Sequence, residues 1–283
     1  DLLIESLAKL NEKLKAEKSN RTIVVFLWIP RDSIRIKPEI AENRAFYEDI
    51  RNEIEENFAD IKHKIIRDLV SDTNASLKDL FFEDSLFEIN NKIKRFKKPY
   101  GIPPLCTHDL QNENEDSIIA NLKLHNLNNK EEDRVKIIFY PIYLNGADRL
   151  LDLDYREAMM GTHLGIFPSY YEPWGYTPLE TAALGVSAIT TDLGGFGQFL
   201  NSKHAQHKNP GIFVLKMLNK SREERIDELF NTLNYFSSLS RQERIQNKIE
   251  SKSLANLVDW SKLIKHYIRA HDKAVEKVYD IKT

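Results

Sequence analysis

The chain has 283 residues, 41% of them hydrophobic and 30% charged, which describes a globular protein long enough to bury a sizeable core. Its 41 basic and 43 acidic residues leave a formal net charge of −2, and this balance gives no reason to expect nucleic acid or a membrane surface as a partner. Cys106 is the single cysteine, so no intrachain disulfide forms, and a reducing, cytoplasmic compartment is expected.

The first element in chain order is an amphipathic helix. The chain begins at Asp1, without a methionine, and leucines follow at once with helical spacing: Leu2, Leu3, Leu7, Leu10 and Leu14. Because the first residue already leads into a helix, we expect the chain to be a fragment, so the absence of a signal peptide carries no information. No apolar run along the chain approaches the roughly 20 residues that span a membrane.

Five apolar runs predict the strands of a parallel sheet. The first, from Thr22 to Ile29, is rich in β-branched residues and ends at Pro30, which indicates a strand buried on both faces. Comparable runs occur at residues 135–140, 163–167, 186–190 and 211–215. Helical segments separate the later runs, at residues 154–160, at 178–184 and from near Phe196 onward. This alternation predicts right-handed βαβ units and an α/β fold with a doubly wound, Rossmann-like sheet.

A helical insertion interrupts the alternation. A long helix from Ala41 to Val70, on the order of 45 Å in length, carries apolar residues in steps of three or four, and a second helical stretch runs from Ser76 to Phe96. The two helices either pack on the domain surface or protrude as a hairpin that makes oligomer contacts. We predict that residues 1–36 and 101–220 form the sheet domain, that 37–100 are inserted, and that 221–283 are C-terminal helices.

The residues that bear chemistry follow the run at residues 163–167. In an open parallel sheet, ligands bind beyond the carboxyl ends of the strands, and here that position holds an aromatic loop with Gly175. Thr177 is predicted to be the N-cap of the next helix, with Pro178 as its first residue. The N-terminus of that helix offers unpaired N–H groups and a positive dipole end, which suit a phosphate.

Two carboxylates bracket this anion site. Glu172 lies in the loop and Glu180 in the helix that follows, and both accept hydrogen bonds from sugar hydroxyls. The pattern therefore predicts a nucleotide diphosphate sugar as ligand. Simpler interpretations stay open: Thr177 and Glu180 have the spacing of a capping box, Glu172 could be an ordinary loop residue, and the aromatic residues could serve packing alone (Tyr170, Tyr171, Trp174 and Tyr176).

The stretch from Tyr170 to Pro178 resembles the signature of glycogen synthases of the animal and fungal type. Further matches span nearly the whole chain and are densest from Asp133 to Gly197. They include Leu7 to Asn11, Pro103-Pro104, Thr107-His108, Asp133 to Pro141, Leu153 to Tyr155, Gly161 to Gly165, Gly195 to Gly197 and Leu257 to Trp260.

The resemblance implies a retaining glycosyltransferase with two Rossmann-like domains. Such enzymes transfer glucose from UDP-glucose to the non-reducing end of an α-1,4-glucan and need no metal or other cofactor, and this chain resembles their C-terminal, donor-binding domain. Catalytic roles would fall to Glu172, at the donor glucose, and Glu180, at the ribose. The remaining donor-binding residues would be Tyr155, stacked on the uracil, together with Trp174, Gly175, Tyr176 and Thr177.

The resemblance also implies assembly and regulation. The family's inserted helices form a tetramer, which favours the oligomer interpretation of residues 37–100. Eukaryotic members carry an arginine-rich helix that senses glucose 6-phosphate. Here Arg241, Arg244 and Lys248 remain with the spacing of one helical face, whereas neighbouring Glu243 and Glu250 dilute the charge, so a solvated helix face is the simpler interpretation.

Two departures from the family limit the prediction. The family has an Arg and a Lys shortly before the helix that opens this chain, and an N-terminal domain that binds the acceptor. Both are absent from this chain, and because positive charge on the leaving diphosphate is a large part of such catalysis, we expect the chain alone to be inactive.

Two alternative functions stand beside this one. ADP-glucose-using starch or glycogen synthases show Glu-Pro-Cys-Gly where this chain has Glu172-Pro173-Trp174-Gly175. A non-catalytic nucleotide-sugar-binding or oligomerisation module would be expected to lose Glu172 or Glu180, and both are present. His163, inside a predicted strand, is expected to be a packed residue, and the histidines show no spacing that predicts a metal site.

Overall fold

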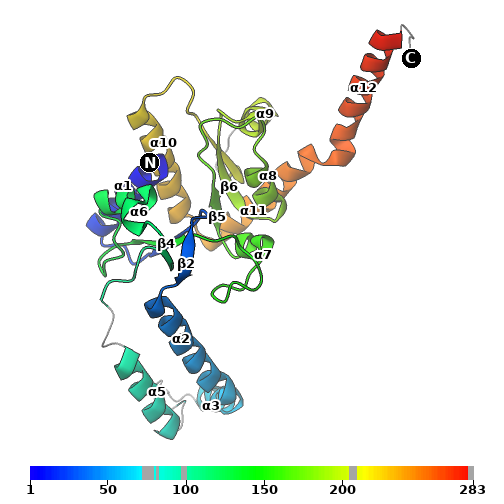
Figure 1. The fold of residues 1–283 in the computed structure, drawn as a ribbon. Coiled ribbons are helices and arrows are strands. Elements are labelled where there is room, and N and C mark those ends of the chain that lie inside the picture. The colour runs from blue at the N-terminus through cyan, green and yellow to red at the C-terminus, as the bar shows by residue number, and fades with distance from the viewer. Residues whose placement is uncertain (72–79, 81–82, 97–100, 204–208, 280–283) are drawn as a thin grey trace. The chain divides into compact units, whose positions relative to one another are not determined.

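The computed structural model describes residues 1–71, 80, 83–96, 101–203 and 209–279 (Figure 1). The chain divides into two compact units. The first consists of residues 1–19, 144–147 and 152–283, and the second of residues 20–143 and 148–151. Each unit has parallel strands, so the predicted α/β class is confirmed. No helix in the described ranges is long and apolar enough to cross a membrane.

Two parallel strands form the centre of the second unit. Strand β1 (Ile23–Trp28) pairs along its whole length with β4 (Val135–Tyr140). Val25 and Leu27 are buried on one face of β1, whereas Val24 on the opposite face is 50% exposed. Successive side chains of a strand point to opposite faces, so β1 is covered mainly on one face. The expectation that it is buried on both faces is therefore wrong at Val24.

The second unit also contains a short antiparallel ladder. Strand β2 (Ser33–Ile36) pairs with β3 (His108–Leu110), and Arg35 donates to the Asp109 carboxylate at 2.9 Å. A 3-10 turn, η1 (Glu113–Glu115), leads to helix α6 (Ser117–Leu124), where Asp116 accepts from two backbone N–H groups as N-cap.

The insertion consists of three described helices, α2 (Pro38–Glu56), α3 (Phe58–Val70) and α5 (Glu83–Phe96). The prediction of a single helix from Ala41 to Val70 is wrong, because the helix is interrupted at Asn57. There the Asn57 side-chain amide donates to the Glu53 carbonyl at 2.8 Å, and such local bonds compete with helix continuation. Residues 72–79 and 81–82, and with them most of the predicted start of the second helix, lie outside the described residues. Helix α2 contacts both α3 and α5 (Figure 1).

Three parallel strands form the centre of the first unit, in the order β5 (Leu164–Ile166), β6 (Ser187–Thr191) and β7 (Ile212–Leu215). Helix α8 (Tyr176–Ala183) follows β5, and α9 (Gly195–Lys203) follows β6. The predicted alternation of strands and helices is confirmed here. Every residue of β6 and β7 is buried, as parallel strands covered on both faces require.

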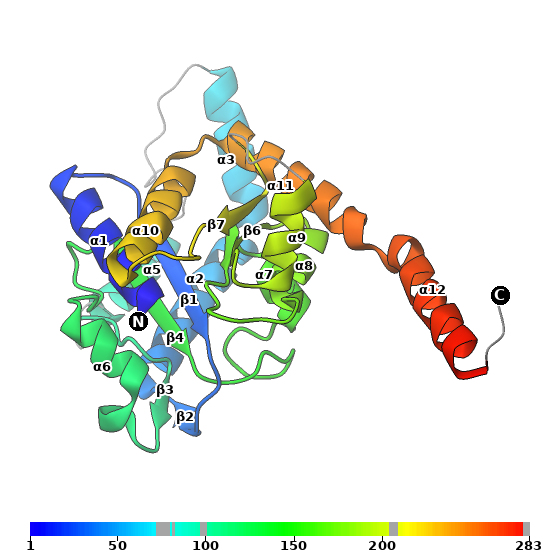
Figure 2. The same ribbon diagram turned by 90° about the horizontal axis from the view of Figure 1, so that it is seen from above.

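The other helices of this unit are α1 (Leu2–Ala16), α7 (Tyr155–Met160), α10 (Arg222–Ser238), α11 (Arg241–Ala255) and α12 (Trp260–Tyr279), with a 3-10 turn η2 (Asn256–Val258). The prediction that the described chain after residue 221 is helical is confirmed. Helices α1 and α10 lie side by side (Figure 2). Capping boxes begin α7, α10 and α11. Side chains from α8, β6, α9, β7 and α11 share one core cluster, centred on Ala182, Ala188, Phe196, Ile212 and Leu254.

Candidate functional site

The loop that carries Glu172 leaves the carboxyl end of β5 and is held by backbone bonds. Its carbonyl oxygens at Glu172 and Trp174 accept from the N–H groups of Gly195, at 3.1 Å, and Phe196, at 2.8 Å. A Cβ atom at Gly195 would overlap the carbonyl oxygen of Pro173, so only glycine allows this approach. The start of α9 therefore fixes the backbone beside Glu172.

Neighbouring hydroxyl groups orient the Glu172 side chain. The Ser169 hydroxyl donates to Glu172 Oε1 at 3.1 Å, and the Thr191 hydroxyl of β6 donates to the Ser169 carbonyl at 2.8 Å. Glu172 faces a small pocket at the carboxyl ends of β5 and β6. Its lining residues are Phe167, Ser169, Glu172, Trp174, Gly175, Pro178, Thr190, Thr191 and Gly194.

Gly175 is the N-cap of α8, and its φ of 103° lies in the left-handed region. The prediction that Thr177 is the N-cap and Pro178 the first helical residue is wrong, because the helix already begins at Tyr176. Pro178 is tolerated two positions later, since the first four N–H groups of a helix have no partner within the helix. A Cβ atom at Gly175 would lie 3.7 Å from Glu172 Oε2, so this glycine adjoins the carboxylate of the pocket.

Glu180 is paired with Tyr155, one of the residues expected at the same ligand. The Tyr155 hydroxyl, from the first residue of α7, donates to Glu180 Oε2 at 3.3 Å. Burial, followed by the charge and hydrogen bond of Glu180, raises the pKa of Tyr155. The capping-box interpretation of Glu180 is wrong, because α8 begins before Thr177 and its cap makes no side-chain bond. The Thr177 carbonyl instead accepts from Thr181.

The aromatic residues of the loop divide into two groups. The Trp174 ring packs against Phe196 and Phe199, with centroids 5.5 and 5.8 Å apart, so its side chain serves the core. The tyrosine side chains face solvent, with exposed fractions of 55% for Tyr170, 77% for Tyr171 and 69% for Tyr176.

The three basic residues singled out on α11 differ in their surroundings. Arg241 is exposed, whereas Arg244 and Lys248 are partly buried, and Arg244 donates to the Leu239 carbonyl at 2.6 Å. Burial and then the charges of Arg244 and Lys248 lower the pKa of His163. His163 is exposed and precedes β5, so the expectation that it is packed inside a strand is wrong. The charges of Arg244 and Lys248 act on it, a relation that sequence reasoning misses because His163 and Arg244 are 81 positions apart.

The described residues bring no three His, Cys, Asp or Glu side chains together as a group that could hold a metal ion. Within the first unit, parallel strands and a glycine-capped helix frame the pocket at Glu172, and Glu180 lies further along the same helix. That combination defines an α/β protein whose site lies at the carboxyl ends of its strands.

Comparisons with known proteins name the family. The family model of glycogen synthase matches residues 1–282, so the chain belongs to the glycogen synthase family. Relatives include glycogen [starch] synthase isoform 1 of Saccharomyces cerevisiae, 33% identical over 99% of this chain and 41% of its own length. The Neurospora crassa enzyme is 32% identical over 99% and 40%, and that of Caenorhabditis elegans 31% identical over 99% and 42%.

The chain thus spans about two fifths of the length of these relatives. Among solved structures, the glycosyltransferase WaaG, involved in lipopolysaccharide biosynthesis, aligns with 53% of this chain and 32% of its own, at 17% identity and a TM-score of 0.33. The resemblance seen in the sequence is confirmed by the family match.

Proposed function

We propose that this chain is the donor-binding part of a retaining glucosyltransferase that moves glucose from UDP-glucose to the non-reducing end of an α-1,4-glucan. The observation that carries the proposal is that Glu172 lies beside the glycine-capped start of α8, the helix whose Glu180 pairs with Tyr155. Membership of the glycogen synthase family supports it.

In this proposal each group has a separate task. The free N–H groups at the start of α8 and its positive dipole end hold the diphosphate. Glu172, beside Gly175 in the pocket, lies where positive charge develops on the sugar as the bond from C1 to the phosphate oxygen breaks, and its negative charge stabilises that state. Glu180 accepts hydrogen bonds from the ribose hydroxyls, and the Tyr155 ring stacks on the base.

The test compares donors in the complete protein, expressed from the whole reading frame of its gene. We expect glucose transfer from UDP-glucose, little from ADP-glucose, and a rate that does not change when EDTA removes metal ions. Glu172→Gln should lower kcat by at least about 100-fold, because it removes the charge that acts in the transition state. Transfer from ADP-glucose alone would favour the other synthase class, and nucleotide-sugar binding without transfer would favour a non-catalytic module.

The 283-residue chain by itself should transfer no glucose. The residues that line the pocket at the start of α8 include no Lys or Arg. Positive charge that stabilises the leaving diphosphate supplies much of the rate in such reactions. Measurable transfer by the isolated chain would contradict this expectation.

We further propose that the inserted helices join copies of the protein in the cytoplasm. Helix α2 has no buried residue, and apolar side chains are exposed on it and on α3, with Tyr47 at 64%, Phe58 at 59% and Leu69 at 77%. Light scattering should find an oligomer that Phe58→Glu and Leu69→Glu dissociate. A monomeric wild-type protein would refute the proposal.

A second site concerns regulation. We propose that α11 binds a phosphate, such as that of glucose 6-phosphate, through Arg244 and Lys248, which are partly buried and whose charges act on His163. The site is supported if glucose 6-phosphate activates the complete protein and Arg244→Ala abolishes that activation. If the protein does not respond to glucose 6-phosphate, these residues of α11 form only a solvated helix face.

A further inference from the structure

Tyr170 is an exposed aromatic residue in the loop of Glu172, and it does not take part in the donor contacts proposed above. It lies two residues before Glu172, and its side chain is 55% exposed. The loop beneath it is fixed, because the carbonyl of Ser169 accepts from Thr191 and the hydroxyl of Ser169 donates to Glu172. The ring is therefore presented to solvent on a backbone that needs little ordering.

Arg225 of α10 lies against this ring. Its guanidinium carbon is 5.6 Å from the ring centroid of Tyr170, within the range of a cation–π contact. Its Nε donates to the Met217 carbonyl at 3.1 Å. One nitrogen therefore sets the orientation of the guanidinium, and the terminal nitrogens make no hydrogen bond to any residue that the structure describes.

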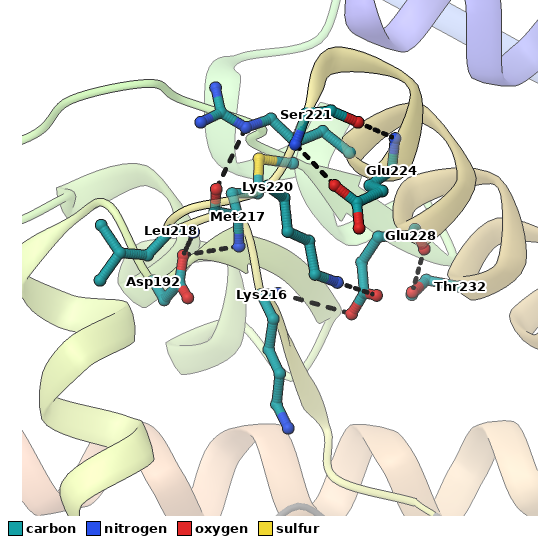
Figure 3. Close-up of polar contacts among 10 residues, drawn as sticks. Asp192, Lys216, Met217, Leu218, Lys220, Ser221, Glu224, Glu228 and Thr232 are labelled. Atoms are coloured by element: carbon teal, nitrogen blue, oxygen red, sulfur yellow. Dashed lines mark hydrogen bonds and ion pairs between the residues drawn. The ribbon is translucent and has the colours of Figure 1, made fainter.

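Hydrogen bonds also fix the segment before Arg225 and the start of α10. Asp192, which directly follows β6, accepts from the N–H groups of Met217, at 2.8 Å, and Leu218, at 3.2 Å (Figure 3). Ser221 and Glu224 close a capping box at the start of α10 (Figure 3). Because the partners are held before any ligand arrives, ordering the guanidinium on binding costs little.

The charges nearby favour a neutral ligand. Glu223 and Glu224 lie in the first turn of α10, directly before Arg225, and hydrogen bonds from Ser221 lower the pKa of Glu224, which keeps it ionised. Lys220 is already paired with Glu228 at 2.8 Å (Figure 3). The nearby carboxylates would therefore repel an anion at Arg225. Neutral hydroxyl groups accept hydrogen bonds from its free N–H groups without that repulsion.

We propose that Tyr170 and Arg225 form a subsite for a glucose unit of the acceptor glucan, next to the donor sugar at Glu172. The apolar face of the sugar packs on the Tyr170 ring, and its hydroxyls accept hydrogen bonds from the terminal nitrogens of Arg225. This inference rests on the proposed function, and it assigns to this chain a contact with the acceptor in addition to those with the donor.

The test is steady-state kinetics of the complete protein with a linear maltooligosaccharide as acceptor and UDP-glucose as donor, each varied in turn. Arg225→Ala and Tyr170→Ala should each raise KM for the maltooligosaccharide about tenfold, equivalent to about 1.4 kcal/mol, with KM for UDP-glucose within about twofold of wild type. Tyr170→Phe keeps the ring and should change KM for the acceptor by less than about twofold.

The matched control is Arg222→Ala, one turn earlier on α10. It removes the same charge from a guanidinium that pairs with Glu5 of α1, and it should leave both KM values unchanged. Thermal melting identifies any variant that fails to fold.

Three results would overturn the inference: an unchanged KM for the acceptor in both alanine variants, a parallel rise in KM for UDP-glucose, or an equal effect of Arg222→Ala. If the unaltered protein transfers no glucose from UDP-glucose, the proposed function is wrong and the subsite falls with it. If the unaltered protein transfers glucose normally and both alanine variants keep the wild-type KM for the acceptor, the subsite is wrong and the proposed function stands.

Discussion

Replacing Gly175 by alanine tests whether the left-handed start of α8 shapes the donor site. Gly175 has a φ of 103°, and Glu172 Oε2 would lie 3.7 Å from an added Cβ atom. The new methyl group thus has room, and the cost comes from the backbone, about 1–2 kcal/mol for an L-residue in this region. Relief of that strain would rotate the first N–H groups of the helix away from the phosphate.

Gly185, just after the other end of α8, provides the matched control. Its φ of 77° is also positive, and nothing lies within 4 Å of an added Cβ atom. Both variants should lose about 1–2 kcal/mol of folding free energy, a shift in Tm of a few degrees. Only Gly175→Ala should weaken binding, because a charged hydrogen bond lost at the phosphate costs about 1.5–3 kcal/mol, or roughly 10- to 100-fold in Kd.

The assay is calorimetric titration of UDP into the complete protein, with Tm measured in parallel. The reasoning is refuted if Gly175→Ala lowers Tm as expected but binds UDP within about twofold of wild type. It is equally refuted if Gly185→Ala weakens UDP binding to the same extent, since the loss would then follow stability rather than the N-cap.

Three further predictions concern single side chains. Tyr155→Phe removes the hydroxyl that bonds Glu180 at 3.3 Å. We expect Tm to change by less than about 2 °C, because the pair is partly exposed, and KM for UDP-glucose to rise about threefold. An unchanged KM would show that the hydroxyl has no part in donor binding. Burial raises the pKa of the Cys106 thiol to about 11, so iodoacetamide at pH 8 should leave it unmodified in the folded protein and label it only after unfolding; rapid labelling of the folded protein would contradict its burial. The lowered pKa of His163 means that the folded protein holds this imidazole neutral at a pH where the unfolded chain binds a proton, so stability falls as pH drops through the ordinary value near 6.5. A bound phosphate favours the protonated form, so the ratio of wild-type to His163→Asn affinity for glucose 6-phosphate should rise as pH falls from 7.5 to 6; the protonation of the phosphate itself near pH 6 affects both proteins alike. An equal ratio at the two pH values would count against the site.

Regular patterns make most of the fold predictable from the sequence, and single local contacts cause the errors. The apolar runs locate β1, β4, β5, β6 and β7, because strands of a parallel sheet read as continuous apolar segments, although β1 exposes Val24. The helix break at Asn57 is hidden, since apolar spacing continues through Ile54, Phe58 and Ile61. At the break, the Asn57 side-chain amide shares the Glu53 carbonyl with the Asn57 backbone N–H, and periodicity does not report such bonds.

The same distinction applies to the site. Glu172, Gly175 and Glu180 are recognisable because they share one short segment beyond a predicted strand. The short ladder of β2 and β3 is not predicted, since its strands are brief, charged and more than 70 residues apart in the chain. The sequence indicates only a packing role for His163 for the same reason, because its charged neighbours come from a distant helix.

The misplaced N-cap changes how the donor helix should be understood. Had Thr177 capped α8, its hydroxyl would have occupied an N–H group that a phosphate needs, and Glu180 would have turned back to the cap. With Gly175 as N-cap, no side chain occupies those donors, and Glu180 is free to meet Tyr155 on α7. The open helix start therefore follows from one feature, an N-cap residue that has no side chain, and Glu180 is not needed at the cap. Placing the cap at glycine leaves the unsatisfied N–H groups of α8 for a ligand, which is the condition that binding of a diphosphate at this helix requires.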